Sequence, residues 1–198
     1  MELSLDSANI VILAKNHNPT IVSKEWLTQK EILTGEIVNF VHTPAFSVTE
    51  TDIFTFIVDP ERLQISIKEN ISENIEILSK IAKAYITKLP ETPYTAIGFN
   101  YLYNITTERK SLKNILSPND EKFKKLFSED YQLGGSIRFK FENFLVIINF
   151  RSENDGKIVA DFNFNFNSED VGKIIEKIET NATIKRKSEE ILEELFND

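Results

Sequence analysis

The stretch IFTFIVDPERLQISI, residues 53–67, predicts a β-hairpin and sets the fold class. Its first part, IFTFIV, is almost continuously apolar, which is typical of a buried strand. The sequence DPER at 59–62 has Asp first and Pro second, as a type I turn prefers. Apolar and polar residues then alternate through LQISIK, so a half-buried strand returns beside the first.

The segments around this hairpin alternate between extended and helical patterns. The clearest helix covers 71–89, where apolar residues recur at helical spacing and Pro90 follows. The remaining elements of the first half are strands at 3–14, 45–58 and 94–105 and a helix within 19–33. The order β-α-β-β-α-β is that of the ferredoxin-like split unit, in which the first two strands run parallel.

The second half continues with helices and one long hairpin. Its predicted elements are helices at 108–116 and 118–128, strands at 134–151 and 157–167 joined by a turn at Asp155-Gly156, and one or two helices over 169–197. The sum is an α+β fold with a mostly antiparallel sheet of about six strands, helices on one face and a long C-terminal helix. We expect one domain over 1–198, with 1–105 and 106–198 as candidate sub-units.

Composition removes several classes of function. The chain has 198 residues, 41% of them hydrophobic, a net charge of −8 and no cysteine. Cys-based zinc sites, iron–sulfur clusters, disulfides and thiol nucleophiles are therefore excluded. The acidity argues against a general phosphate-backbone binder. Dinucleotide, P-loop, serine-hydrolase and zinc-protease motifs are absent from the sequence, so we expect no cofactor and no metal.

The start of the chain also bears on localisation. The N-terminal sequence MELSLDSANIV is acidic where a signal peptide is basic. The longest unbroken apolar run, 144–148, is far too short to span a bilayer. These features predict a cytoplasmic protein.

The two histidines, His17 in NHNPTIV and His42 in VHTPAFSV, are the weak catalytic candidates. Each precedes a proline by two residues, so both are expected to mark turns. A single functional His acting as a general base is the alternative. The predicted topology places the two histidines at opposite ends of a strand, roughly 30 Å apart, which argues against a joint acid–base or metal site.

The stretch DFNFNFN at 161–167 predicts a strand with two different faces. The phenylalanines share the face expected in the core, whereas Asn163, Asn165 and Asn167 share the other face. Because Asn is disfavoured in strands, a row of amides there is a candidate ligand or partner surface. A merely solvated face is the alternative.

One basic segment interrupts the acidic chain. It lies within 108–125 and is either an acidic-partner or nucleic-acid contact or the solvated face of a helix. Its candidate residues are Arg109, Lys110, Lys113, Lys122, Lys124 and Lys125. We expect nucleic acid to bind only through this segment, if at all, and no membrane partner.

Three stretches, PERLQIS at 60–66, AIGFNYLYNI at 96–105 and VADFNFNFNSEDVGKIIEKIETN at 159–181, resemble a sporadically distributed bacterial and archaeal protein family. That family has no assigned activity, so the resemblance implies an architecture and no catalytic residues. Its patchy distribution implies an accessory or genome-defence role.

The leading hypothesis is a non-catalytic interaction or assembly subunit whose partner is another protein or a second copy. The first alternative is a small-ligand-binding module with a pocket between the sheet and the C-terminal helix. A His-dependent hydrolase or nuclease ranks last.

Overall fold

The computed structural model describes residues 1–33, 35–68, 71–107, 112–116, 120–127, 132–153 and 157–196. Its centre is one nine-stranded sheet with the order β2-β3-β4-β5-β1-β6-β9-β8-β7, in which all neighbours pair antiparallel. The strands are β1 (Glu2–Ala14), β2 (Asn39–His42), β3 (Ser47–Glu50), β4 (Phe54–Val58), β5 (Arg62–Ile67), β6 (Tyr94–Thr106), β7 (Gly134–Phe141), β8 (Phe144–Ser152) and β9 (Ile158–Asn167).

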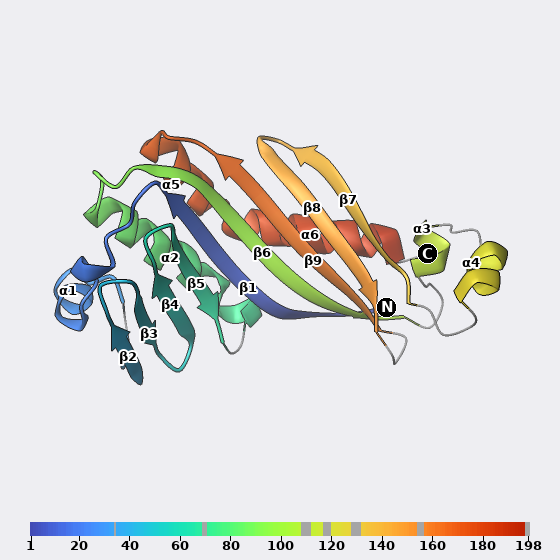
Figure 1. Cartoon of the computed structure of the whole chain (residues 1–198), viewed down its shortest axis with the longest axis horizontal. Coiled ribbons are helices and arrows are strands. Elements are labelled where there is room, and N and C mark those ends of the chain that lie inside the picture. Colours follow the sequence, from blue (N-terminus) through green and yellow to red (C-terminus); the bar gives the residue numbers. More distant parts are fainter. Residues whose placement is uncertain are drawn as a thin grey trace.

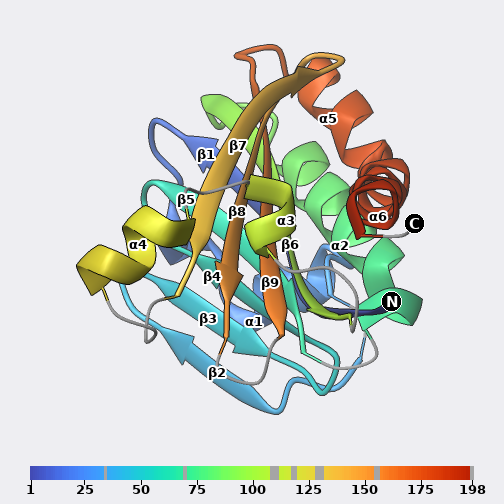
Figure 2. The same cartoon turned by 90° about the vertical axis from the view of Figure 1, so that its right-hand side faces the viewer.

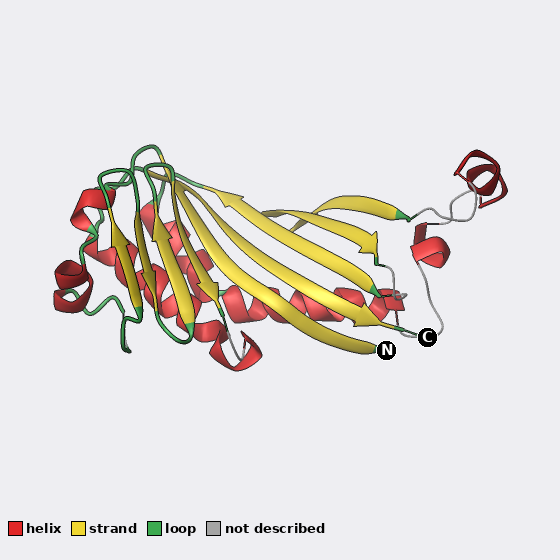
Figure 3. Ribbon diagram, turned by 60° about the horizontal axis from the view of Figure 1, so that its bottom comes forward, coloured by secondary structure: helices red, strands yellow, loops and turns green. Residues whose placement is uncertain are grey.

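The helices that pack on the sheet all lie on one side of it. Figure 1 shows α2, α5 and α6 behind the strands, and Figures 2 and 3 show the same single layer from two other directions. The described helical elements are the 3-10 turn η1 (Pro19–Ile21), α1 (Lys24–Gln29), α2 (Ile71–Lys88), α3 (Leu112–Leu116), α4 (Asp120–Phe127), α5 (Val171–Glu179) and α6 (Asn181–Phe196).

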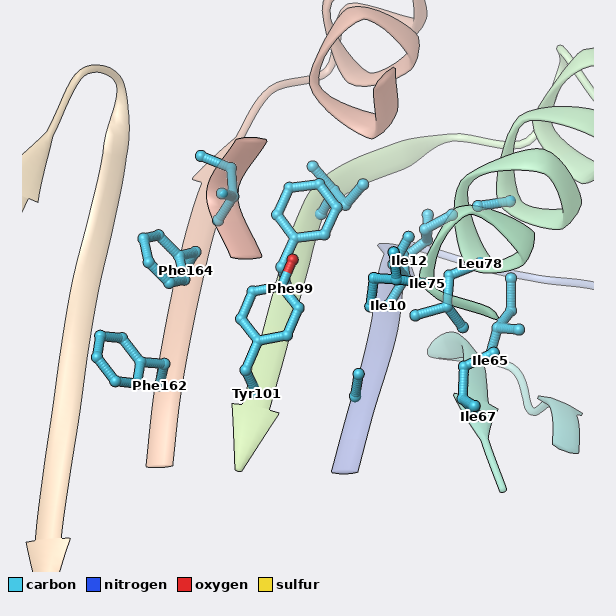
Figure 4. Packing of buried hydrophobic residues seen from close by; sticks show 14 of the residues in the cluster. Ile10, Ile12, Ile65, Ile67, Ile75, Leu78, Phe99, Tyr101, Phe162 and Phe164 are labelled. Carbon is cyan, nitrogen blue, oxygen red and sulfur yellow. The ribbon is translucent and has the colours of Figure 1, made fainter. Parts of the chain in front are cut away.

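Strict alternation along the central strands separates the core from the opposite face. On β1, Ile10 and Ile12 are fully buried while their neighbours are only partly buried, and the same pattern holds for Phe162 and Phe164 on β9. Figure 4 shows these side chains together with Phe99 and Tyr101 of β6. One continuous apolar layer therefore lies between the sheet and the helices.

Two buried tyrosines of β6 bind the sheet directly to α6. The Tyr101 hydroxyl donates to Asn181 Oδ1 at 2.5 Å, and the Tyr103 hydroxyl lies 2.6 Å from Ser188 Oγ. Burial raises the pKa of both phenols, so both stay protonated and can donate. The amide of Asn181 also donates to the carbonyl of Ile75 in α2, at 3.1 Å, which fixes the two helices against each other.

The prediction of about six strands is wrong, because two tight turns each split a predicted strand and one short edge strand was not predicted. The predicted strand 45–58 is split where Thr51 Oγ1 accepts from the backbone N–H groups of Ile53 and Phe54. The predicted strand 134–151 is split at Glu142, which adopts a positive φ of 49° that its residue type does not signal. The third addition, β2, is a short and mostly exposed edge strand with little apolar patterning.

The predicted parallel start of the sheet is also wrong. The first strand, β1, lies in the middle of the sheet and pairs antiparallel with both β5 and β6. Short hairpins connect β2 through β5, so the chain returns to β1 without the crossover that parallel strands need. The sheet is continuous across both predicted sub-units, since β9 pairs with β6 over ten residue pairs from Ala96↔Asn167 to Ile105↔Ile158.

Local capping hydrogen bonds determine where several of the helices begin. The predicted helix within 19–33 is broken into η1 and α1, and Ser23 Oγ accepts from the N–H of Trp26 to begin α1. Asp170 caps α5, and the C-terminal region breaks into two helices at Thr180. The predicted turn at Asp155-Gly156 lies outside the described residues.

Candidate functional site

The candidate site is the face of the sheet opposite α2, α5 and α6, which we call the open face. Its side chains alternate with the core residues along the central strands, and the strand register places them in rows that cross the sheet. Two adjacent rows run across the six strands from β4 to β8. We call them the uncharged rows.

The first uncharged row is polar. In sheet order it consists of Thr55, Ser66, Asn9, Asn100, Asn163 and Ile147. Its three asparagines are joined side chain to side chain: Asn100 Nδ2 donates to Asn9 Oδ1 at 2.8 Å, and Asn163 Nδ2 donates to Asn100 Oδ1 at 2.6 Å. The amides therefore form a fixed ladder across three strands rather than independent mobile groups.

The second uncharged row is more apolar. In the same order it consists of Ile57, Gln64, Val11, Gly98, Asn165 and Leu145. Leu145 is 37% exposed at one end of the row, and Val41 on β2 is 41% exposed beyond the other end. Gly98 leaves a gap beside Val11, because it has no side chain in the middle of the sheet.

Charged side chains border these rows. In the first row, Glu50 on β3 lies beyond Thr55, and Arg138 on β7 lies beyond Ile147. Lys140 on β7 ends the second row, next to Leu145. Arg138 and Lys140 are exposed and form no ion pair with any side chain in the described part of the chain. Glu50 lies 3.5 Å from Lys68 Nζ.

A partly buried carboxylate lies one row away, at Asp161 on β9. Burial raises its pKa, and the charge of Arg151 on β8 opposes this effect in part. The open face thus has two uncharged rows, Asp161 in the row beside them, an acidic residue towards the β3 edge and basic residues along the β7 edge.

The predicted amide row lies on this face. Asn163 belongs to the ladder, whereas Asn165 and Asn167 lie further along β9 and interact weakly with each other at 3.4 Å. The last two line a shallow depression of about 290 Å³ at the β7–β8 turn, together with Lys140, Glu142, Asn143, Phe144 and Leu145. Polar groups of this depression can accept or donate hydrogen bonds to a bound partner.

His17 is a buried part of the core. Its Nε2 lies 3.2 Å from the carbonyl oxygen of Ile12, which can only accept, so Nε2 carries the proton. Its Nδ1 then accepts from the Tyr85 hydroxyl at 3.3 Å. Burial lowers the pKa of the imidazole, and the ring also packs edge-on against Tyr94. Both ring nitrogens are occupied, which leaves none for catalysis.

His42 is exposed on the edge strand β2, where its ring stacks on Phe40. The prediction that the two histidines lie at opposite ends of a strand rested on the parallel start and is corrected here. His42 pairs with Ser47, and Ser47 with Val58, at the same end of the sheet as the end of β1 that leads to His17. His17 is buried with both ring nitrogens hydrogen-bonded to Ile12 and Tyr85, whereas His42 is exposed on β2, so the two residues do not form a joint site.

The described members of the predicted basic segment lie away from the uncharged rows. Lys113 on α3 and Lys122 and Lys125 on α4 are exposed, and both helices project beyond the end of the sheet at which β7 begins (Figure 1). Arg109, Lys110 and the side chain of Lys124 lie outside the described residues. The basic residues that border the open face, Arg138 and Lys140, were missed.

The sequence prediction also missed Asn9, Asn100 and Val11. Each of them alternates with buried residues along its strand, so the signal was present in the same form as in DFNFNFN. Only the register between strands shows that these residues lie next to Asn163 and Asn165.

Comparison with models of known protein families and with curated protein sequences gives no match. Within the described ranges, no three His, Asp or Glu side chains are grouped so that they could hold a metal ion. Of the helices described, none is both long and apolar enough to cross a bilayer.

Proposed function

We propose that this protein is a non-catalytic interaction subunit that docks another protein chain on the open face of its sheet. The observation that carries the proposal is the absence of charge from the two rows that cross β4, β5, β1, β6, β9 and β8. In a chain with 27% charged residues, a solvated sheet face would be expected to carry Lys and Glu at many of these positions.

The distribution of charge on this face supports docking of a protein. Protein interfaces are depleted of charge at their centre and are polar at their rim. Here Glu50, Arg138 and Lys140 lie outside the uncharged rows, and Leu145 and Val41 expose apolar surface at their ends. The asparagine ladder adds pre-ordered amide groups, which reduces the entropy lost when a partner binds.

The ligand-binding alternative is less well supported. The space between the sheet and α6 is occupied at Tyr101 and Tyr103, whose hydroxyls reach α6 directly. A cavity of about 480 Å³ lies along α6, beside Ile191 and Leu195, and is also lined by Lys187, Glu190 and Glu194. The described residues that line it all belong to α6 and three of them are charged, so it is an open hollow along one helix and not an enclosed pocket between the sheet and α6.

A photo-cross-linking side chain at position 145, on the open face, tests the proposal in the native host cell. The matched control places the same group at Thr87, which is exposed on α2 in the opposite layer. We expect a defined protein adduct from position 145 and none from position 87. Equal labelling from the two positions, or no adduct from position 145, would contradict docking on the open face.

A further inference from the structure

We infer that the chain on the open face is a second copy of this protein, related by a two-fold axis that runs parallel to the strands between β1 and β6. This inference rests on the proposed function, since it names the occupant of the same surface. It follows from the size of the face and from the way its rows match when the sheet is turned onto itself.

The open face is large enough for a stable dimer. From β3 to β7 it spans eight adjacent strands, ~38 Å at the usual spacing, and the rows from Leu13 to Ser7 extend ~23 Å along β1. Because β3 and β4 have only four and five residues, the face covers roughly 800 Å², close to the ~800 Å² that each partner buries in a standard interface, and its outer rows include Arg62 and Asp161. A single small ligand would leave most of this surface uncovered.

Rotation about the inferred axis places each strand of one copy over a different strand of the other. In the sheet order, β1 then faces β6, β5 faces β9, β4 faces β8 and β3 faces β7. A two-fold interface must be self-complementary in this way, because every contact occurs twice.

The second uncharged row matches itself under this rotation. Val11 of one copy faces Gly98 of the other, so a side chain meets the position without one. Ile57 faces Leu145, which pairs apolar surface with the exposed end of the row. Gln64 and Asn165, the remaining pair, are both amides and can exchange hydrogen bonds.

The first uncharged row matches at its two inner pairs, whereas its outer pair places Thr55 opposite Ile147. Asn9 faces Asn100, and Ser66 faces Asn163, so each pair offers a donor to an acceptor. Aligned sheets cross at about 30°, so these pairs near the axis are displaced less than those at the rim.

The rim charges are complementary in the same arrangement. The rotation brings Glu50 at the β3 edge, whose carboxylate also lies 3.5 Å from Lys68 Nζ of its own copy, over Arg138 and Lys140 at the β7 edge. The rim lies ~17 Å from the axis, so the 30° crossing shifts it by ~9 Å along the strand, which is close to the ~7 Å that separates Arg138 from Lys140 along β7. A two-fold axis perpendicular to the strands would instead place like edges over each other, which like-charge repulsion disfavours.

The first experiment measures the molar mass of the purified protein by light scattering over a range of concentrations. We expect twice the chain mass of 22.8 kDa for the wild type and for the control Thr87→Lys. Gly98→Lys should be monomeric, because it puts a charge and a long side chain opposite Val11. A Cβ fits at Gly98 within one subunit, since its nearest neighbour, Phe164 O, would lie 3.6 Å away.

Leu145→Lys is a second variant, at an already exposed position, and should also be monomeric. Circular dichroism and thermal unfolding confirm that each variant is folded. A monomeric wild type, or a dimer that survives both Gly98→Lys and Leu145→Lys, would overturn the inference.

The second experiment tests the symmetry by exchanging rim charges. Glu50→Arg alone, and Arg138→Glu with Lys140→Glu in one chain, should each weaken self-association by about tenfold or more, because like charges then meet across the interface. An equimolar mixture of the two variants should recover wild-type affinity, since both rim contacts become complementary in the mixed dimer. Failure of the mixture to recover would rule out the inferred axis.

The outcomes separate the two proposals. An adduct from position 145 with a different protein, together with a monomeric purified chain, would overturn the second copy and leave the docking function standing. An adduct between two copies supports both. No adduct from position 145 would remove the docking function and, with it, the inferred dimer.

Discussion

Asn100 lies directly opposite Asn9 on the open face and donates its Nδ2 hydrogen to Asn9 Oδ1 at 2.8 Å. The same Asn100 accepts from Asn163 on its other side, at 2.6 Å. One side chain thus links three neighbouring strands, and the amide dipoles align across the middle of the sheet. This ordering distinguishes the row from a set of independent solvated residues.

Replacement of Asn100 should therefore cost more than replacement of an asparagine outside the ladder. Asn100→Ala removes two hydrogen bonds between half-buried groups, and we expect a loss of about 1–2 kcal/mol in the free energy of unfolding. The measurement is urea denaturation of the purified protein. The control is Asn167→Ala, whose side chain is exposed and makes only a 3.4 Å contact with Asn165. Equal losses in the two variants would show that the ladder is not cooperative.

The tyrosines that reach α6 permit a second stability test. Tyr101→Phe leaves the buried Oδ1 of Asn181 without its 2.5 Å donor, so the free energy of unfolding should fall by about 1–3 kcal/mol. Tyr94→Phe is the matched control, because that hydroxyl donates to Leu89 O in a less buried setting. Denaturant titration compares the two. A larger loss for Tyr94→Phe would contradict the role given to Tyr101.

These residues also mark what the sequence could predict. Alternation in DFNFNFN and in the hairpin at 53–67 identified buried and exposed faces within single strands, because the side-chain direction of a strand has period two. The helix at 71–89 was predicted because its apolar spacing is regular and proline follows it. Each of these signals is local.

The features that were missed depend on pairing between distant segments. The contact of Asn9 with Asn100 spans 91 positions of sequence, and nothing in either strand specifies its partner. The number of strands was underestimated because Glu142 and Thr51 form turns without Gly or Pro. The burial of His17 depends on β5, which returns antiparallel beside β1. The turn that leads into β5 brings Pro60 O to 2.8 Å from the backbone nitrogen of His17.

Replacement of Asp161 by asparagine should stabilise the fold increasingly as the pH rises. Burial raises its folded pKa above 3.8, so the folded state resists ionisation and is destabilised at pH values where the unfolded carboxyl is charged. Asp161→Asn should therefore increase the free energy of unfolding at pH 7, and this gain should disappear as the pH falls below the unfolded pKa. The effect is small because the group is half exposed and Arg151 offsets part of it.

Urea titrations of wild type and Asp161→Asn at pH 7 and at about pH 3.5 measure this difference. Asp6→Asn is the control, because Asp6 is an exposed carboxylate on β1. A loss of stability in Asp161→Asn at pH 7 would mean that attraction to Arg151 outweighs the cost of burial.

The burial of His17 should make the free energy of unfolding depend on pH with the opposite sign to the effect of Asp161. Its folded pKa lies below the ordinary value of 6.5, because burial disfavours the imidazolium, while Asp59 in the β4–β5 turn favours it less strongly. The groups facing the ring from α2 and β6 are the neutral phenols of Tyr85 and Tyr94. The unfolded state therefore binds a proton before the folded state, and stability should fall as the pH drops below about 6.5.

His17→Gln should reduce the loss of stability between pH 7 and about pH 5. At pH 7 the variant should be less stable than the wild type by about 1–3 kcal/mol, because the hydrogen bonds to Ile12 and Tyr85 are lost. The matched variant is His42→Gln, at the exposed histidine on β2, which should keep the wild-type slope. Thermal unfolding across this pH range follows both variants. If the slope disappears in His42→Gln and persists in His17→Gln, the protonation that destabilises the fold occurs at the edge strand and not in the core.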